Sequence, residues 1–210
     1  MKKQRTVYQL IVDKSGSMQD CKEKTILGFN EQVNKLSILE KEFPEQHINM
    51  GLTTFNDQVS QQFFQASPNN VQKLTENNYR PNGGTALLDA IGSTVQFLEN
   101  DSLTQSAFDT TFVIVILTDG YENSSRMYTL DHIRTLITRL EATGKWTFSF
   151  IGATLDAVDV AASMNIKRQN SRSFSKESMD NEVWEDVSNK LHGYLNKKRS
   201  FQDLDNFLEK

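Results

Sequence analysis

Segments typical of buried strands alternate with amphipathic helical segments along almost the whole chain. The β-branched apolar run at residues 6–12 is the first strand segment, and the unbroken apolar run at residues 111–117 suits the centre of a sheet. Between and after them, apolar residues recur at the spacing of a helix face. This alternation predicts an α/β fold with a doubly wound, Rossmann-like sheet that is mostly parallel and has helices on both faces.

One strand of this sheet is expected to run against the others. Apolar residues at 47–55 are separated from those at 59–64 by only a turn at Asn56-Asp57. Parallel neighbours need a crossover of roughly a dozen residues or more, so such a short link fits a hairpin. The sequence therefore predicts a mixed sheet with an antiparallel strand near an edge.

Length and composition fit one domain at residues 1–200, followed at 201–210 by a short helix that packs on the domain or makes contacts. With 210 residues, 37% of them hydrophobic, the chain can fill a core. A single cysteine excludes a disulfide scaffold, and a net charge of −4 offers no general basic field for nucleic acid. No stretch approaches the roughly 20 apolar residues that span a bilayer. We expect a cytoplasmic protein with neither nucleic acid nor a membrane as its partner.

Polar residues gather in three loops that should meet at one edge of the sheet. Asp13, Ser15 and Ser17 follow the first strand, Asp119 follows the central strand, and Thr85 precedes a helix. All five side chains offer oxygen, which hard cations such as magnesium, manganese and calcium prefer. Alternate residues of an extended turn point the same way, so the first three oxygens should converge. The loops therefore predict a site for a divalent cation.

This set of donors would leave the cation with an open position. Two carboxylates cannot surround a divalent ion, so hydroxyl oxygens and waters would fill most of its shell. An incoming acidic group is favoured at the remaining position because the metal keeps uncompensated charge. The donor chemistry thus favours a site that accepts a carboxylate.

The same loops resemble, in their order and residue types, the metal-ion-dependent adhesion site of von Willebrand factor type A domains. The resemblance covers nearly the whole chain, and residues 119–123 further resemble small stand-alone bacterial members of that family. It implies a sheet of about six strands and an intact site. Ser15, Ser17 and Thr85 would touch the metal, with Asp13 and Asp119 close by, directly or through water. The matching segments are Asp13-Lys14-Ser15-Gly16-Ser17, Gly83-Gly84-Thr85 and Leu117-Thr118-Asp119-Gly120.

The first functional hypothesis is a non-enzymatic, metal-dependent protein-binding module. The resemblance implies that a bound divalent cation, with magnesium favoured over manganese or calcium, receives an Asp or Glu side chain of a partner protein. Side chains around the ion would set specificity, although the sequence context of Glu122 by itself favours a merely solvated carboxylate. The expected partner-binding rim consists of Lys14, Met18, Tyr121, Glu122, Arg126 and Leu155.

Two alternatives stay open at this point. The first is a magnesium-dependent, phosphatase-like enzyme in which Asp13 accepts a phosphoryl group, as in haloacid-dehalogenase-like phosphatases or receiver domains. That pattern fits less well, because those phosphatases have a second aspartate where this chain has Ser15. The second alternative is a regulator of a larger assembly, with the metal site as a switch and the apolar stripe at residues 201–208 as its output.

Overall fold

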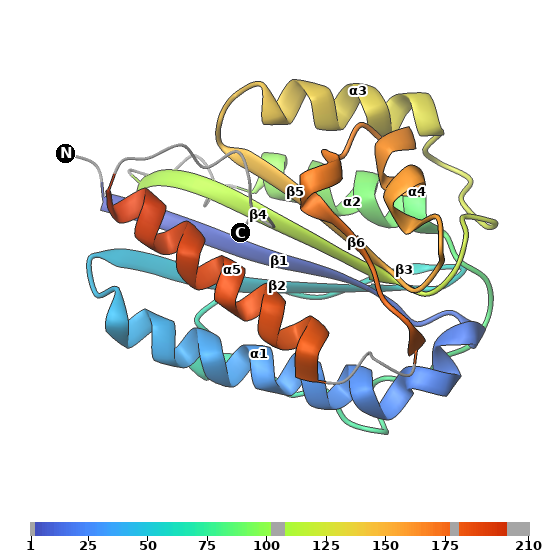
Figure 1. Cartoon of the computed structure of the whole chain (residues 1–210), viewed down its shortest axis with the longest axis horizontal. Coiled ribbons are helices and arrows are strands. Elements are labelled where there is room, and N and C mark those ends of the chain that lie inside the picture. The colour runs from blue at the N-terminus through green and yellow to red at the C-terminus, as the bar shows by residue number, and fades with distance from the viewer. Residues whose placement is uncertain (1–2, 102–107, 177–180, 201–210) are drawn as a thin grey trace.

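A computed structural model describes residues 3–101, 108–176 and 181–200 of the chain. One sheet runs through the middle of the molecule (Figure 1). Its strands are β1 (Lys3–Asp13), β2 (Gln46–Phe55), β3 (Val59–Ala66), β4 (Phe108–Thr118), β5 (Trp146–Gly152) and β6 (Ser171–Ser173).

The strand order and directions confirm the predicted sheet. Its order is β3-β2-β1-β4-β5-β6, so β1 and β4 lie at the centre. All neighbouring pairs are parallel except β2 and β3, which are antiparallel and joined by the short turn at Asn56-Asp57. The chain thus has the expected doubly wound α/β fold, with six strands and one antiparallel edge strand.

Helices cover both faces of the sheet. In Figure 1, α1 and α5 lie on one face, whereas α2, α3 and α4 lie on the other. In the described parts of the chain, no helix is both long and apolar enough to cross a bilayer. The helix predicted at 201–210 lies outside the described residues. The helices are α1 (Lys22–Glu42), α2 (Leu87–Asn100), α3 (Leu130–Glu141), α4 (Ala157–Ser163) and α5 (Asn181–Arg199).

The central strands are buried on both faces, which explains their unbroken apolar runs. In β1, Leu10 and Val12 pack in the core under α1 and α5, while Val7 and Ile11 pack under α2, α3 and α4. Successive side chains of a strand point to opposite faces, so a strand with helices on both sides needs apolar residues at nearly every position. The two cores fix the strand ends from which the polar loops emerge.

A buried lysine holds the end of α5 against the sheet. The Nζ atom of Lys198 donates hydrogen bonds to the backbone oxygen of Arg5 at 2.7 Å, to Thr6 Oγ1 at 3.0 Å and to Thr111 Oγ1 at 2.9 Å. Burial lowers the pKa of Lys198 to about 8, with Asp109 acting to raise the pKa and nearby Arg5 and Lys145 to lower it. Burial therefore makes the protonated form of Lys198 unfavourable in the folded protein.

Lys198 is expected to make the free energy of unfolding depend on pH in the alkaline range. An unfolded lysine titrates near pH 10.4, so between about pH 8 and 10 the unfolded chain holds a proton that folded Lys198 has lost. Stability rises with pH wherever the unfolded state binds more protons. Lys198→Met should remove a rise of up to about 1.4 kcal/mol per pH unit, measured by denaturant unfolding from pH 7 to 10. Lys197→Met is the control, and equal pH profiles for the two variants would contradict this account.

Candidate metal centre

The three predicted loops are tied together by backbone hydrogen bonds at the carboxyl ends of β1 and β4. The amide of Gly16, in the loop after β1, donates to the Gly83 oxygen at 3.0 Å. The amide of Asn123, in the loop after β4, donates to the Thr85 oxygen at 3.0 Å. A third loop, at residues 82–86, therefore bridges the two strand ends.

Asp13 is buried, and hydrogen bonds fix both of its carboxylate oxygens. Oδ1 accepts from the Ser15 amide at 2.6 Å, and Oδ2 accepts from Thr118 Oγ1 at 2.6 Å. Burial raises the pKa of Asp13 to about 6, although the hydrogen bonds from Thr118 and Ser15 act to lower it and the charge of Asp119 raises it further. The folded chain thus holds this carboxyl group rigidly at the end of β1.

Hydroxyl groups connect the loop after β1 to Asp119. Ser15 Oγ lies 3.1 Å from Ser17 Oγ, which donates to Asp119 Oδ1 at 2.6 Å. Thr85 is buried, and a Cβ atom built on Gly120 would lie 3.2 Å from Thr85 Oγ1 and 3.6 Å from Ser17 Oγ. Both hydroxyls therefore lie next to Gly120, and the structure brings the predicted donors of all three loops together.

A lysine that the sequence analysis missed reaches this group. Lys176 follows β6, and its ammonium forms an ion pair with Asp119 Oδ2 at 2.6 Å. Burial acts to lower the pKa of Lys176, but its contacts with Asp119 and Asp20 outweigh this effect and raise the pKa above its ordinary value. No motif or spacing marks a lone lysine so far along the chain, so only the fold reveals this contact.

The chemistry of the cluster fits a hard divalent cation. Asp119 has a fully buried side chain, and one of its oxygens faces a positive charge, the Lys176 ammonium. The remaining donors are Asp13 and three hydroxyl groups, which suit magnesium, manganese or calcium. In the described ranges, no cluster of three or more His, Cys, Asp or Glu side chains offers another kind of metal site.

The residues expected to form the rim differ in exposure. Arg126 is exposed, Tyr121 is 56% exposed and Leu155 is fully exposed, whereas Lys14 is half-buried. Met18 is fully buried in the core beneath α1 and α5, so the expectation that it contacts a partner is wrong. The 3-10 helix at Gly16–Cys21 turns this side chain inward.

Glu122 binds its own loop instead of being merely solvated. Its carboxylate accepts hydrogen bonds from the amides of Leu88, Ser124 and Ser125 at 3.0, 2.9 and 2.7 Å, and from the Ser125 hydroxyl at 2.7 Å. With its oxygens occupied in this way, Glu122 positions the loop after β4 against the start of α2. Glu122 is half-buried. It contributes to the rim by fixing the conformation of the loop after β4.

Asp89, in the first turn of α2, anchors the same loop. Its carboxylate accepts from the amides of Arg126, Met127 and Tyr128 at 2.8 to 2.9 Å. Asp89→Ala would leave three amides without an acceptor, so we expect a loss of about 3 kcal/mol of stability, or roughly 6–12 °C in Tm. Thermal unfolding beside Asp131→Ala, an exposed carboxylate on α3, measures this effect; equal losses in both variants would show that the anchor is unimportant.

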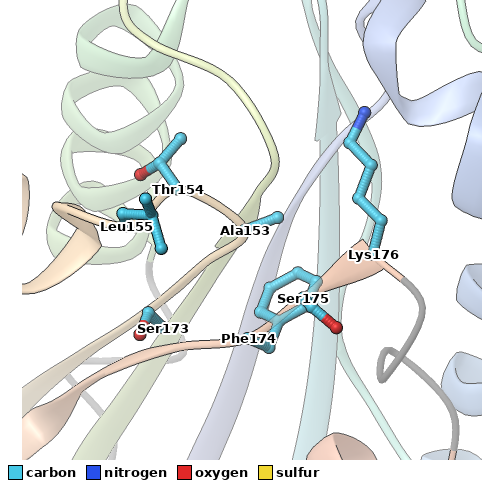
Figure 2. Close-up of a pocket in the computed structure, with 7 residues that line it drawn as sticks. All are labelled: Ala153, Thr154, Leu155, Ser173, Phe174, Ser175 and Lys176. Carbon is cyan, nitrogen blue, oxygen red and sulfur yellow. The ribbon is translucent and has the colours of Figure 1, made fainter.

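A groove of about 510 Å³ lies next to the cluster. Residues 153–155, after β5, line one side, and residues 173–176 line the other (Figure 2). Lys176 belongs to the groove, and in Figure 2 its side chain extends away from Phe174 and Ser175. Since its ammonium contacts Asp119, the groove and the oxygen cluster share this lysine.

Comparison with known proteins identifies the family. Residues 9–190 match the family model of the von Willebrand factor type A domain. The chain belongs to this family. No curated protein sequence matches this VWA domain.

Solved structures share the fold of this VWA domain at low sequence identity. The manganese-loaded TRAP protein of Plasmodium vivax has a TM-score of 0.59 and 17% identity, covering 84% of this chain and 71% of that one. Proximal thread matrix protein 1 of the mussel byssus, with zinc in its metal-ion-dependent adhesion site (MIDAS) motif, has a TM-score of 0.59 and 14% identity. The match covers 88% of this chain and 45% of that one. The vWF domain of the pilus tip protein Mfa5 of Porphyromonas gingivalis has a TM-score of 0.60 and 9% identity. The match covers 91% of this chain and 96% of that one. The chain thus spans about half the length of the mussel protein.

Proposed function

We propose that this VWA domain is a divalent-cation-dependent protein-binding module. The observation that carries the proposal is the convergence of Ser15, Ser17 and Asp119, linked by contacts of 3.1 and 2.6 Å, beside Asp13 and Thr85. Proteins of this family commonly mediate protein–protein interaction, and some of its solved structures hold manganese or zinc.

Each residue of the cluster has a defined part in this function. Ser15, Ser17 and Thr85 would hold the cation through their hydroxyl oxygens, with Asp13 and Asp119 neutralising its charge directly or through water. Magnesium is the ion favoured for this donor set, with manganese and calcium also compatible. When bound, the cation would supply an open coordination position for a carboxylate oxygen of a partner's Asp or Glu.

The surroundings of the cluster favour an acidic partner with an apolar neighbour. Lys14 and Arg126 offer positive charge, while Tyr121 and Leu155 offer exposed apolar surface. Charged side chains at the rim steer an oppositely charged partner, and exposed apolar groups contribute buried area once the complex forms. We therefore expect these four residues to set specificity for the acidic segment.

Nothing in the environment of Asp13 favours the phosphatase-like alternative. A phosphoryl acceptor needs a carboxylate oxygen that an incoming phosphorus atom can approach. Asp13 is fully buried, and its two oxygens already accept hydrogen bonds from the Ser15 amide and the Thr118 hydroxyl. The arrangement suits a residue that holds a loop and balances the charge of a cation.

Capture experiments test the binding function against the enzyme. The immobilised protein should retain a specific protein from lysate with magnesium or manganese, release it with chelator, and fail to retain it as the Asp119→Ala variant. Replacing the contacting Asp or Glu of the captured protein with its amide should abolish retention. Turnover of a generic phosphomonoester with magnesium, combined with metal-independent capture, would instead support the enzyme.

A further inference from the structure

We propose that Lys176 is an internal cation that competes with the divalent metal for Asp119 and withdraws when the metal binds. The inference rests on the proposed metal site. Its basis is the position of the Lys176 ammonium, 2.6 Å from Asp119 Oδ2 and 3.0 Å from the backbone oxygen of Ser17. Both contacts belong to residues of the oxygen cluster, so the ammonium neutralises charge that the metal would otherwise neutralise.

The competition follows from electrostatics. The Asp119 side chain is fully buried, whereas the Lys176 side chain that pairs with it is 31% exposed. An ammonium beside Oδ2 disfavours a divalent ion at the same carboxylate, because like charges repel strongly where water is scarce. Metal binding to Asp119 therefore favours an outward position of the ammonium.

The surroundings of Lys176 allow this movement without unfolding. Phe174 anchors the segment, since its ring is buried in the core and its amide donates to the Gly152 oxygen at 2.9 Å. Beyond this anchor, the flexible lysine stem can swing outward. Asp20, whose side chain is 76% exposed, already lies 3.4 Å from the ammonium and offers it a partner nearer to solvent. Lys176 thus has one partner inside the site and one at its edge.

Movement of Lys176 would also change the groove beside the site. Residues 173–176 form one wall of that groove, opposite residues 153–155 (Figure 2). When the ammonium leaves Asp119, the end of this wall loses its tie to the loop after β4. Metal binding would therefore be coupled to the shape of the surface on which a partner docks.

Calorimetric titration with manganese tests the competition through affinity. Lys176→Met removes the charge while keeping the length of the side chain, and we expect it to tighten metal binding about tenfold, within the usual range of site coupling of about 5- to 150-fold. Lys22→Met is the matched control, because it removes an equal charge at the start of α1, where the Lys22 ammonium pairs with Glu76. Its effect should be several-fold smaller.

Amine labelling gives a second, direct readout. In the wild-type protein, mass spectrometry should show that an acylating reagent modifies Lys176 faster after manganese is added, while the rate at Lys22 stays constant. Unchanged labelling, or affinities that are equal in the Lys176→Met and Lys22→Met variants, would overturn the inference and leave the metal site standing. Failure of the wild type and both variants to bind metal would overturn the proposed function together with the inference.

Discussion

Asp119→Ala is expected to weaken manganese or magnesium binding by more than about 100-fold. Even residues that only orient metal ligands typically cost about 10- to 100-fold when replaced, and Asp119 supplies charge to the cluster itself. The variant also removes the acceptor of the Ser17 hydroxyl, which otherwise lies 2.6 Å from Asp119 Oδ1. Titration calorimetry on the metal-stripped proteins measures the difference.

A matched control separates this local effect from a general loss of negative charge. Asp156 lies near the same edge of the sheet, where it accepts a hydrogen bond from the Tyr121 hydroxyl at 2.9 Å. Asp156→Ala removes the same charge as Asp119→Ala without touching the oxygen cluster, so its metal affinity should stay within about threefold of wild type, as expected for an exposed charge. Equal affinities of the two variants would show that the site has been placed wrongly.

Asp13→Asn is expected to weaken metal binding about as strongly as Asp119→Ala does. The metal-free variant should be at least as stable as the metal-free wild-type protein. The buried Asp13 carboxylate is costly to ionise, and Asp119 repels it. An asparagine keeps an oxygen for the Ser15 amide and removes the charge. Its amide nitrogen can donate to the Thr118 hydroxyl, which can itself donate to the Gly120 oxygen 3.2 Å away. Metal-induced stabilisation should disappear, because the uncharged side chain no longer balances the cation.

Thermal unfolding with and without manganese measures both effects of Asp13→Asn. The wild-type midpoint should rise with metal, and the variant midpoint should not respond. Asp13→Ala serves as a comparison, because it leaves the Ser15 amide and the Thr118 hydroxyl without their acceptor and should unfold earlier than the asparagine variant. An asparagine variant that still gains stability from manganese would contradict the assignment of Asp13.

The fold could be predicted from the sequence because its strongest constraints are local. Residues 6–12 and 111–117 had to be buried on both faces, and the turn at Asn56-Asp57 was too short for a parallel crossover. The exact ends of the strands were less predictable, since β1 and β4 extend beyond their apolar cores to Lys3 and Phe108. Polar residues at these strand ends, such as Lys3, Gln4 and Asp109, pair with the neighbouring strand without an apolar signature.

In the candidate site, the sequence could predict only those residues that the order of the strands brings close together. Carboxyl ends of parallel strands share one edge, so Asp13 and Asp119 were expected to approach each other despite their separation along the chain. The side chains around them depend on tertiary packing. Met18 points into the core because the 3-10 helix turns it inward, Glu122 binds backbone amides, and Lys176 reaches Asp119 from another strand end.

Titration of the metal-stripped wild-type protein with manganese tests the central claim most directly. The convergence of two carboxylates and three hydroxyl groups at one edge of the sheet predicts saturable binding of one ion per chain and a higher unfolding midpoint in its presence. Absence of both binding heat and stabilisation across millimolar manganese would contradict the account, and the oxygen cluster would then be a purely structural tie between three loops.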